Sequence, residues 1–251
     1  MRIVASLTTL PGRVWGLGVM VDSVLRQTRR PDRFVLQLPE ICRRTGESYP
    51  VVGGFPDGLE VRRCGCDWGP ATKLVGALED EHEPGTAIVT LDDDVEYAPC
   101  LLADLERWAE ELPKSVVGMV GGSMFGGYSK LTHGEEIDVP QAVGGLGGYR
   151  GVLYRRWMFD LEQVRAELSE LWAEGPFLAD DTYFTSWLER HGIPRRVVPP
   201  SWKPGGNVAG VGFLKRSDSI YLGPGAGGEA IEASEKLMAR KHAEWLAGAK
   251  A

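Results

Sequence analysis

Short apolar runs alternate with stretches of helical periodicity along the first half of this chain. Five runs there have the length and composition of strands, at residues 2–8, 33–38, 59–64, 87–91 and 116–120, and a last short strand-like run follows at 195–198. Between the first two lie apolar residues spaced as on one face of a helix, namely Leu17, Met20, Val21, Val24 and Leu25. This alternation is typical of βαβ units, in which helices join parallel strands and cover the sheet. The sequence therefore predicts an α/β fold with a Rossmann-like, mostly parallel sheet flanked by helices in a single domain.

Composition excludes several classes of protein. The chain has 251 residues, of which 43% are hydrophobic and 25% charged, and a formal net charge of −7. These values are usual for soluble globular proteins, and no stretch approaches the roughly 18 apolar residues of a membrane span. The negative charge argues against a nucleic-acid partner, which needs a broad basic surface. The first strand follows no signal-peptide pattern, so we expect a cytoplasmic protein, and the four cysteines lack the spacing of a zinc site.

Three consecutive carboxylates, Asp92, Asp93 and Asp94, follow the apolar run at 87–91. In α/β proteins ligands bind at the carboxyl ends of the strands. Residues two apart in a strand point to the same side, so we expect Asp92 and Asp94 to converge, and Asp93 to point elsewhere unless the chain has already turned. Carboxylate oxygens suit a divalent cation such as Mn²⁺ or Mg²⁺, which can neutralise a diphosphate. The alternative is a solvated acidic turn.

A second acidic pair, Asp180 and Asp181, precedes an apolar helical pattern at 182–188. An aspartate at the start of a helix can cap unpaired backbone N–H groups and interact with the helix dipole. Helix capping is therefore one explanation of the pair, and capping and a chemical role can coexist.

These segments together resemble the GT-A fold glycosyltransferases, in particular the family 2 type, which use nucleotide-sugar donors. The resemblance covers residues 1 to about 200. It is carried by the loop with Thr8, Thr9, Pro11 and Arg13, the segment 67–73, the triple acid, the Gly-Tyr-Arg-Gly stretch at 148–151, and the second acidic pair. It implies a GT-A type sheet and sugar transfer.

The resemblance assigns the nucleotide to the first loop and to two later residues. Thr8, Thr9 and Arg13 would hold the base, ribose and phosphate, Asp67 would recognise a pyrimidine, and Lys73 would reach the diphosphate. For Lys73 the alternative is an exposed position on a helix.

The resemblance also assigns the metal and the catalytic base. Asp94 is the expected metal ligand, while Asp92 shares the metal or lies near the ribose, and Asp93 does either. Asp181, with Asp180 behind it, would take the proton from an acceptor hydroxyl as that hydroxyl attacks the anomeric carbon with inversion. Many GT-A enzymes complete the metal site with a histidine near the C-terminus. Only His242 follows the last predicted strand here, so the third ligand is left unassigned.

We expect residues 1–228 to form the catalytic domain, with a nucleotide-binding half at 1–121 and an acceptor half at 122–228. The glycine-rich stretch 118–151 is either an active-site lid or an irregular insertion. Trp202 and Lys203 are candidates for the acceptor side. Residues 229–251 form an amphipathic helix that either packs on the domain, which we favour, or lies on an anionic membrane surface.

The predicted function is a metal-dependent, hexosyltransferase-like glycosyltransferase. It would move a sugar from a nucleotide-sugar donor, UDP by resemblance, to a hydroxyl of a glycan, a lipid-linked sugar or another acceptor. One alternative is a nucleotide-sugar or glycan binding module without catalysis. Another is a metal-dependent nucleotide enzyme such as a nucleotidyltransferase, although its signature lysine and glycine loop is missing.

Overall fold

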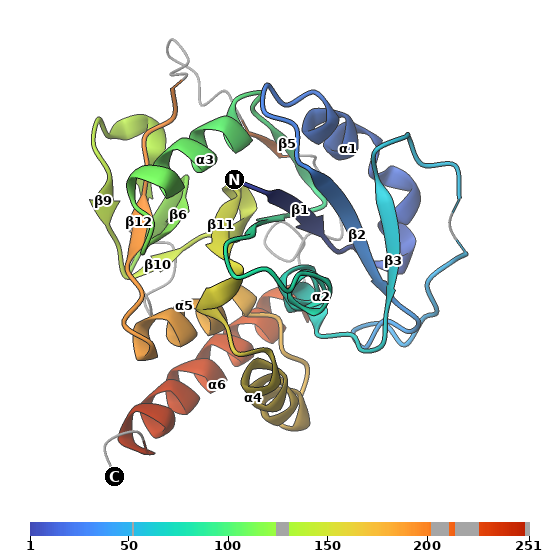
Figure 1. Cartoon of the computed structure of the whole chain (residues 1–251). Helices are drawn as coiled ribbons and strands as arrows, with labels where there is room; N and C mark the ends of the chain where they lie inside the picture. The colour runs from blue at the N-terminus through green and yellow to red at the C-terminus, as the bar shows by residue number, and fades with distance from the viewer. Residues whose placement is uncertain (52, 124–130, 202–210, 214–225, 249–251) are drawn as a thin grey trace.

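The computed structural model describes residues 1–51, 53–123, 131–201, 211–213 and 226–248 (Figure 1). Its centre is an eight-stranded sheet. The strand order is β3 (Glu60–Cys64), β2 (Arg33–Pro39), β1 (Ile3–Leu7), β4 (Ala87–Leu91), β11 (Val152–Arg155), β6 (Val116–Gly118), β12 (Arg195–Val197) and β9 (Gln141–Ala142). The predicted α/β class, with a mostly parallel sheet flanked by helices, is confirmed.

Strand direction decides which loops meet at each edge of the sheet. β3, β2, β1 and β4 are parallel neighbours, as are β6 and β12. β11 runs antiparallel between β4 and β6, and β9 is an antiparallel edge strand. The carboxyl ends of β1 and β4 and the amino end of β11 therefore lie at one edge.

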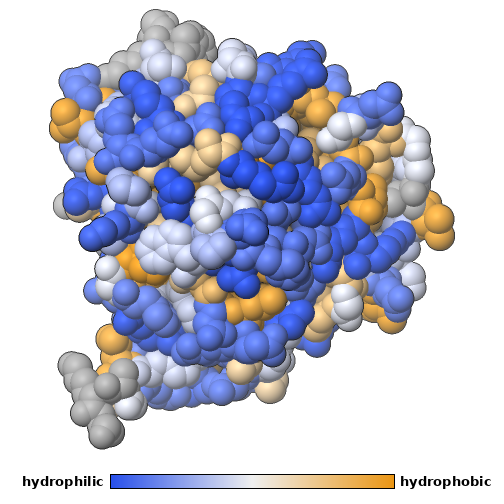
Figure 2. Space-filling model, viewed as in Figure 1, coloured by the Kyte–Doolittle hydropathy of each residue, from blue (hydrophilic) through white to orange (hydrophobic). Residues whose placement is uncertain are grey.

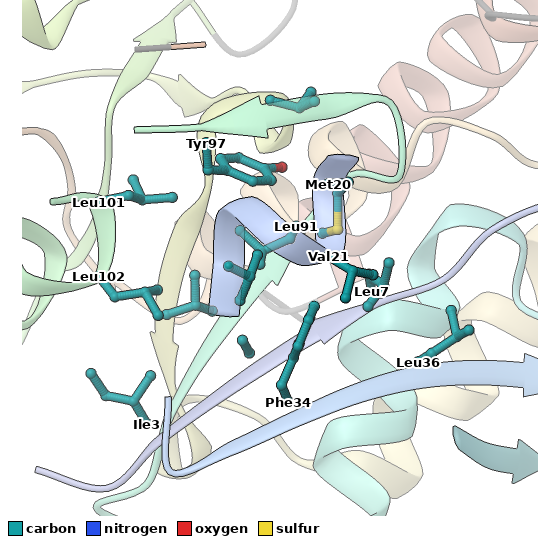
Figure 3. Close-up of a cluster of buried hydrophobic side chains, with 14 of the residues drawn as sticks. Ile3, Leu7, Met20, Val21, Phe34, Leu36, Leu91, Tyr97, Leu101 and Leu102 are labelled. Carbon is teal, nitrogen blue, oxygen red and sulfur yellow. The ribbon is translucent and has the colours of Figure 1, made fainter. Parts of the chain in front are cut away.

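Helices cover both faces of this sheet. Figure 1 shows α1 (Gly18–Leu25) and α3 (Leu101–Glu111) on one face and α2 (Thr72–Asp80), α4 (Leu161–Ala173) and α5 (Asp180–Arg190) on the other. The side chains of β4 alternate accordingly, because successive residues of a strand point to opposite faces. Ala87, Val89 and Leu91 join the core under α1 and α3, whereas Ile88 joins the core under α2 and α5. Figure 3 shows the first of these cores.

The second half is less regular than its apolar pattern predicts. The predicted strand at 116–120 is divided at Met119 into β6 and β7 (Val120–Gly122). β7 pairs with β8 (Thr132–His133) and β10 (Gly145–Leu146) in a small sheet, and β5 (Val95–Tyr97) pairs with β13 (Val211–Phe213). Five short 3₁₀ helices complete the described elements: η1 (Pro11–Gly16), η2 (Gly69–Ala71), η3 (Gly134–Glu136), η4 (Gly148–Arg150) and η5 (Arg156–Met158). Part of the glycine-rich stretch, like Trp202 and Lys203, lies outside the described residues.

The C-terminal helix α6 (Ala226–Gly248) packs against α5. Met238 is fully buried, Ser234 accepts a hydrogen bond from the Leu178 N–H at 3.0 Å, and His242 Nδ1 lies 2.8 Å from Ser186 Oγ. The apolar side of this helix thus packs against the protein, with Ile231, Leu237 and Trp245 half-buried beside Met238, as the packing alternative predicts. Figure 2 shows mainly hydrophilic side chains over α4 and α6 on the face in view. The division of residues 1–228 into two halves stays a prediction. Within the described residues, no helix combines the length and the hydrophobicity needed to cross a bilayer.

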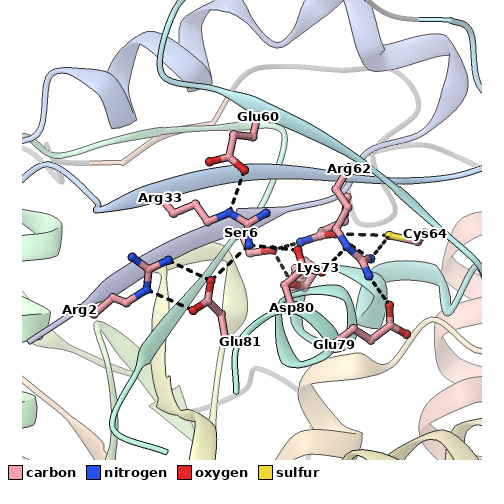
Figure 4. Close-up of polar contacts among 11 residues, drawn as sticks. Arg2, Ser6, Arg33, Glu60, Arg62, Cys64, Lys73, Glu79, Asp80 and Glu81 are labelled. Carbon is pink, nitrogen blue, oxygen red and sulfur yellow. Dashed lines mark hydrogen bonds and ion pairs between the residues drawn. The ribbon is translucent and has the colours of Figure 1, made fainter. Parts of the chain in front are cut away.

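A network of ion pairs fixes the C-terminal end of α2 (Figure 4). Glu81, just after the helix, is paired with Arg2 and with Arg33 at 3.2 Å each. Arg2 immediately precedes β1, and Arg33 is the first residue of β2. Arg62 on β3 is paired with Glu79 at 2.9 Å. The contacts of Glu81 lie at the amino ends of β1 and β2, so the first turn of α2 is held near the opposite edge, where the acidic residues gather.

Candidate active site

The first loop lies directly beside the triple acid. β1 and β4 pair in parallel with Leu7 opposite Leu91, so the residues that follow these two strands are neighbours. Thr9 Oγ1 donates a hydrogen bond to Asp93 Oδ2 at 2.5 Å, and a guanidinium nitrogen of Arg13 lies 3.0 Å from Asp93 Oδ1. All three side chains are buried. Asp93 is therefore held by the first loop.

The direction of Asp93 follows from where the strand ends. β4 stops at Leu91, and Asp93 and Asp94 form a turn that leads into β5. The chain thus turns directly after β4, which is the case in which Asp93 is not expected to follow the alternation of a strand and point elsewhere. The alternative of a solvated acidic turn does not hold for Asp93, which is 7% exposed.

Asp92 is held from two sides. Its backbone N–H donates a hydrogen bond to the Tyr97 hydroxyl oxygen at 2.7 Å, and Lys73 Nζ lies 2.7 Å from its Oδ1. Tyr97 is buried and comes from β5, immediately after the turn. The position of Asp92 is thus set by Tyr97 on β5 and by Lys73 on α2.

Asp94 is half-buried, with a side chain 21% exposed, as is Asp92, whose side chain is 30% exposed. A guanidinium nitrogen of Arg13 lies 3.9 Å from Asp94 Oδ2, and the same nitrogen is closer to Asp93. Burial, and then repulsion from Asp92 and Asp93, raise the pKa of Asp94 to about 6. This corner of the site therefore carries an excess of negative charge.

The second acidic pair lies at the start of α5, and Lys73 links it to the first. Lys73 Nζ lies 2.9 Å from Asp180 Oδ2 while it also contacts Asp92. Lys73 is 5% exposed, so the alternative of an exposed helix position is wrong. The carboxylates of Asp180 and Asp92 outweigh burial and hold the pKa of Lys73 well above its ordinary value. One buried ammonium thus joins two acidic segments that are far apart in the sequence.

Asp181 contacts a third segment, η4. Its Oδ2 accepts a hydrogen bond from the Gly148 N–H at 2.8 Å. Ala179, and not an aspartate, is the N-cap residue of α5, and Asp180 and Asp181 lie in its first turn, where negative charge interacts favourably with the helix dipole. Burial, and then repulsion from Asp180, raise the pKa of Asp181 to about 8. A carboxylate tuned toward neutral pH is a suitable proton acceptor.

Two residues assigned to the nucleotide make structural contacts. Thr8 Oγ1 donates a hydrogen bond to the Gln37 carbonyl oxygen at 2.9 Å. Asp67 accepts hydrogen bonds from the N–H groups of Arg43 at 2.6 Å and Gly69 at 2.7 Å. Asp67 therefore fixes the loop that enters α2, and its recognition of a pyrimidine stays a prediction.

The carboxylates suit a metal ion only in part. Asp92 and Asp94 supply hard oxygen donors beside unneutralised negative charge, which fits Mn²⁺ or Mg²⁺. Among the residues that the structure describes, however, no three His, Cys, Asp or Glu side chains gather as a metal-binding group. His242 contacts Ser186 on α5, and His191 stacks on Trp187 with ring centroids 4.1 Å apart. Neither His242 nor His191 is therefore assigned as the third metal ligand.

Sequence reasoning missed several contacts of this site. The Gly148 N–H is a backbone donor to Asp181 that no sequence pattern indicates, although residues 148–151 are among the segments that carry the resemblance. The Tyr97 hydroxyl has no signal beyond its closeness to the triple acid. The pairing of Lys73 with Asp180 joins residues from separate helices, which no local pattern reveals.

Comparisons with known proteins give a distant structural similarity. No protein-family model and no curated protein matches the chain. Among solved structures, its fold is similar to that of residues 1–349 of TarS from S. aureus, with 13% sequence identity and a TM-score of 0.47. The match covers 82% of this chain and 59% of that chain, so this chain spans less than two thirds of the TarS structure. At this TM-score the similarity decides neither the family nor the activity.

Proposed function

We propose that this protein is a metal-dependent glycosyltransferase that moves a sugar from a nucleotide-sugar donor to an acceptor hydroxyl with inversion. The observation that carries the proposal is the contact of one buried ammonium, that of Lys73, with both acidic segments at 2.7 Å and 2.9 Å. It brings carboxylates suited to a diphosphate-bound cation next to carboxylates suited to proton transfer. Sugar transfer from a nucleoside diphosphate needs both at one place.

Asp181 is the proposed base. A hydrogen bond from the Gly148 N–H to Oδ2 fixes its carboxylate. The pKa of Asp181, raised to about 8, lets the carboxylate accept the proton of an acceptor hydroxyl during attack on the anomeric carbon. Asp180 supports it by holding Lys73 and by its negative charge.

The donor side consists of the triple acid and the first loop. Asp94 would hold Mn²⁺ or Mg²⁺ with Asp92 sharing it, and the bound ion would neutralise the charge that develops on the leaving diphosphate. Thr8, Thr9 and Arg13 lie at the carboxyl end of β1, beside the triple acid, and are proposed to contact the nucleotide. The preference for UDP rests on the resemblance alone.

The acceptor is proposed to be a hydroxyl of a glycan, a lipid-linked sugar or another molecule. Its binding residues are assigned to the second half of the chain, and the candidates Trp202 and Lys203 lie outside the described residues.

Calorimetric titration with UDP, GDP, dTDP and CDP, each with and without manganese, tests the donor assignment. We expect one nucleotide to bind, and to bind more tightly when manganese is present, because a bound divalent cation would offset the repulsion between the phosphates and the acidic residues. Tightening for one nucleotide would support the proposal and identify the donor class. Absence of binding under every condition would instead favour a module without catalysis.

Replacing Gly148 by alanine is expected to lower the transfer rate by about 100-fold, the cost of misplacing a catalytic group by about 1 Å. A Cβ atom at this position would lie 2.5 Å from Asp181 Oδ1, so the carboxylate must move. Gly85→Ala is the matched control, because no described atom lies within 4 Å of its added Cβ. Steady-state rates of the two variants are compared, and equal rates would contradict the placement of Asp181.

A further inference from the structure

We propose that Lys73 is a positioning residue that ties the donor side of the site to the base Asp181 through Asp92 and Asp180. The inference rests on the proposed function, because it assigns Lys73 a part in the same reaction. It differs from the role that the resemblance implies, in which Lys73 reaches the diphosphate.

The burial of Lys73 makes its partners obligatory. The side chain is 5% exposed, and a buried ammonium without a partner is strongly unfavourable. Its two ion pairs, at 2.7 Å to Asp92 and 2.9 Å to Asp180, compensate that cost. Movement of either carboxylate would therefore be opposed by the loss of an ion pair in a region of low dielectric.

The backbone of Lys73 is itself anchored to the sheet. Ser6 Oγ on β1 donates a hydrogen bond to the Lys73 carbonyl oxygen at 2.6 Å (Figure 4). One residue earlier, Thr72 Oγ1 accepts a hydrogen bond from the Trp68 N–H at 2.8 Å. Because the ion pairs of Glu81 fix the other end of α2, the lysine projects from a rigid support. The two acidic segments are thus located relative to β1 and not only to each other.

Lys73 also supplies positive charge to the carboxylates around the base. The groups that act on Asp181 are Asp180 from α5, Lys73 from α2, Asp92 after β4 and the Gly148 N–H from η4, and the phenols of Tyr149 and Tyr154 sense its charge. Burial raises the pKa of Asp180 and of Asp181, and Lys73 opposes both shifts. Removal of the ammonium should therefore make Asp181 keep its proton to higher pH.

The test measures the titration of Asp181 directly, without substrate. NMR of the carboxyl carbons in protein with labelled aspartate follows the midpoint, and Asp181→Asn identifies the signal. In Lys73→Met the midpoint should rise by about 1–3 pH units, the effect of losing a nearby opposite charge. In Asp180→Asn it should fall, because the main repelling carboxylate is gone.

Variant pairs keep the test decisive if Lys73→Met fails to fold. The double variant Lys73→Met with Asp180→Asn removes both members of an ion pair and leaves a less costly interior than either single change. Its Asp181 midpoint should lie above that of Asp180→Asn alone. An equal midpoint in these two proteins would overturn the inference.

Arg190→Met is the matched control. Arg190 on α5 makes a buried ion pair with Glu167 on α4 at 2.6 Å, and it contacts neither acidic segment. Its loss should lower thermal stability and leave the Asp181 midpoint unchanged. If Lys73→Met likewise lost stability without a shift of the midpoint, Lys73 would be a structural residue and the inference would fail.

Activity separates this inference from the proposed function. In Lys73→Met the rise of kcat with pH should move upward together with the Asp181 midpoint. A shifted midpoint in a protein that neither binds nucleotide nor transfers sugar would uphold the coupling and reject the transferase. Transfer with an unshifted midpoint in Lys73→Met would do the reverse.

Discussion

Replacing Asp181 by asparagine is expected to lower the rate of sugar transfer by about 10²–10⁴-fold, the usual contribution of a general base. Asparagine keeps the shape of the side chain and can still accept the Gly148 N–H, but it cannot take a proton. Donor affinity should stay at the wild-type value, because the donor is assigned to the other acidic segment. Steady-state kinetics and calorimetric titration of the donor nucleotide measure the two quantities.

Asp160→Asn is the control for this change. Asp160 caps α4 through hydrogen bonds to the N–H groups of Glu162 and Gln163 at 3.0 Å and 3.1 Å, and asparagine is an equally good cap. Its transfer rate should match that of the wild type. A wild-type rate in Asp181→Asn would mean that another group accepts the proton.

The raised pKa of Asp181 gives the reaction a defined pH dependence. The carboxylate is the working form of a base, so the wild-type rate should rise as pH increases through about 8 and level off above it. The folded protein holds this proton at a pH at which the unfolded chain has lost it. Ionisation of Asp181 therefore costs stability, which should decline as pH rises from about 4 to about 8. Asp181→Asn should lack this contribution to the decline.

Replacing Asp94 by alanine is expected to abolish the tightening of donor binding by manganese. Loss of even an outer partner of a metal site costs about 10–100-fold in affinity, so loss of a direct ligand should cost at least that much. The fold should persist, because the carboxylate of Asp94 lies beside like charges that raise its pKa to about 6 and make its ionised form unfavourable. Calorimetric titration with and without manganese measures the effect.

Asp57→Ala, on an exposed turn, is the control for the loss of one negative charge. It should bind donor and manganese as the wild type does. If Asp94→Ala retained the full effect of manganese, Asp94 would not be a metal ligand, while the assignment of Asp181 would be unaffected.

The sequence was sufficient for the parallel half of the sheet. The continuous apolar run of β4 and the helical spacing on α1 and α2 are local patterns, and parallel pairing then brings the loop after β1 beside the residues after β4. The approach of Thr9 and Arg13 to Asp93 follows from that register. The strand ends at Leu91 and the chain turns at Asp93. The two-residue periodicity of a strand therefore does not predict which of the three carboxylates is buried.

The remaining contacts depend on tertiary packing. Periodicity places Lys73 on a helix but does not say which carboxylates face it, and Asp180 comes from a helix that packs nearby only once the sheet has formed. The interruption of the predicted strand at Met119 likewise reflects a change of partner strands, from β11 and β12 to β8 and β10. Patterns of single segments carry no information on such partners.

The reversed direction of β11 has a consequence for how this protein can diverge. In the parallel strands β1 and β4, the residues at the acidic edge are those that follow the carboxyl end of each strand. Any change there alters the loops that hold Thr9 and Asp92. Because β11 is antiparallel to β4, the segment that lies at that edge is the one that precedes the strand, η4 with Gly148. The segment between β7 and η4 can therefore vary in length and sequence without disturbing the strands behind the triple acid. We expect related proteins to vary in acceptor through this segment while their donor chemistry stays the same.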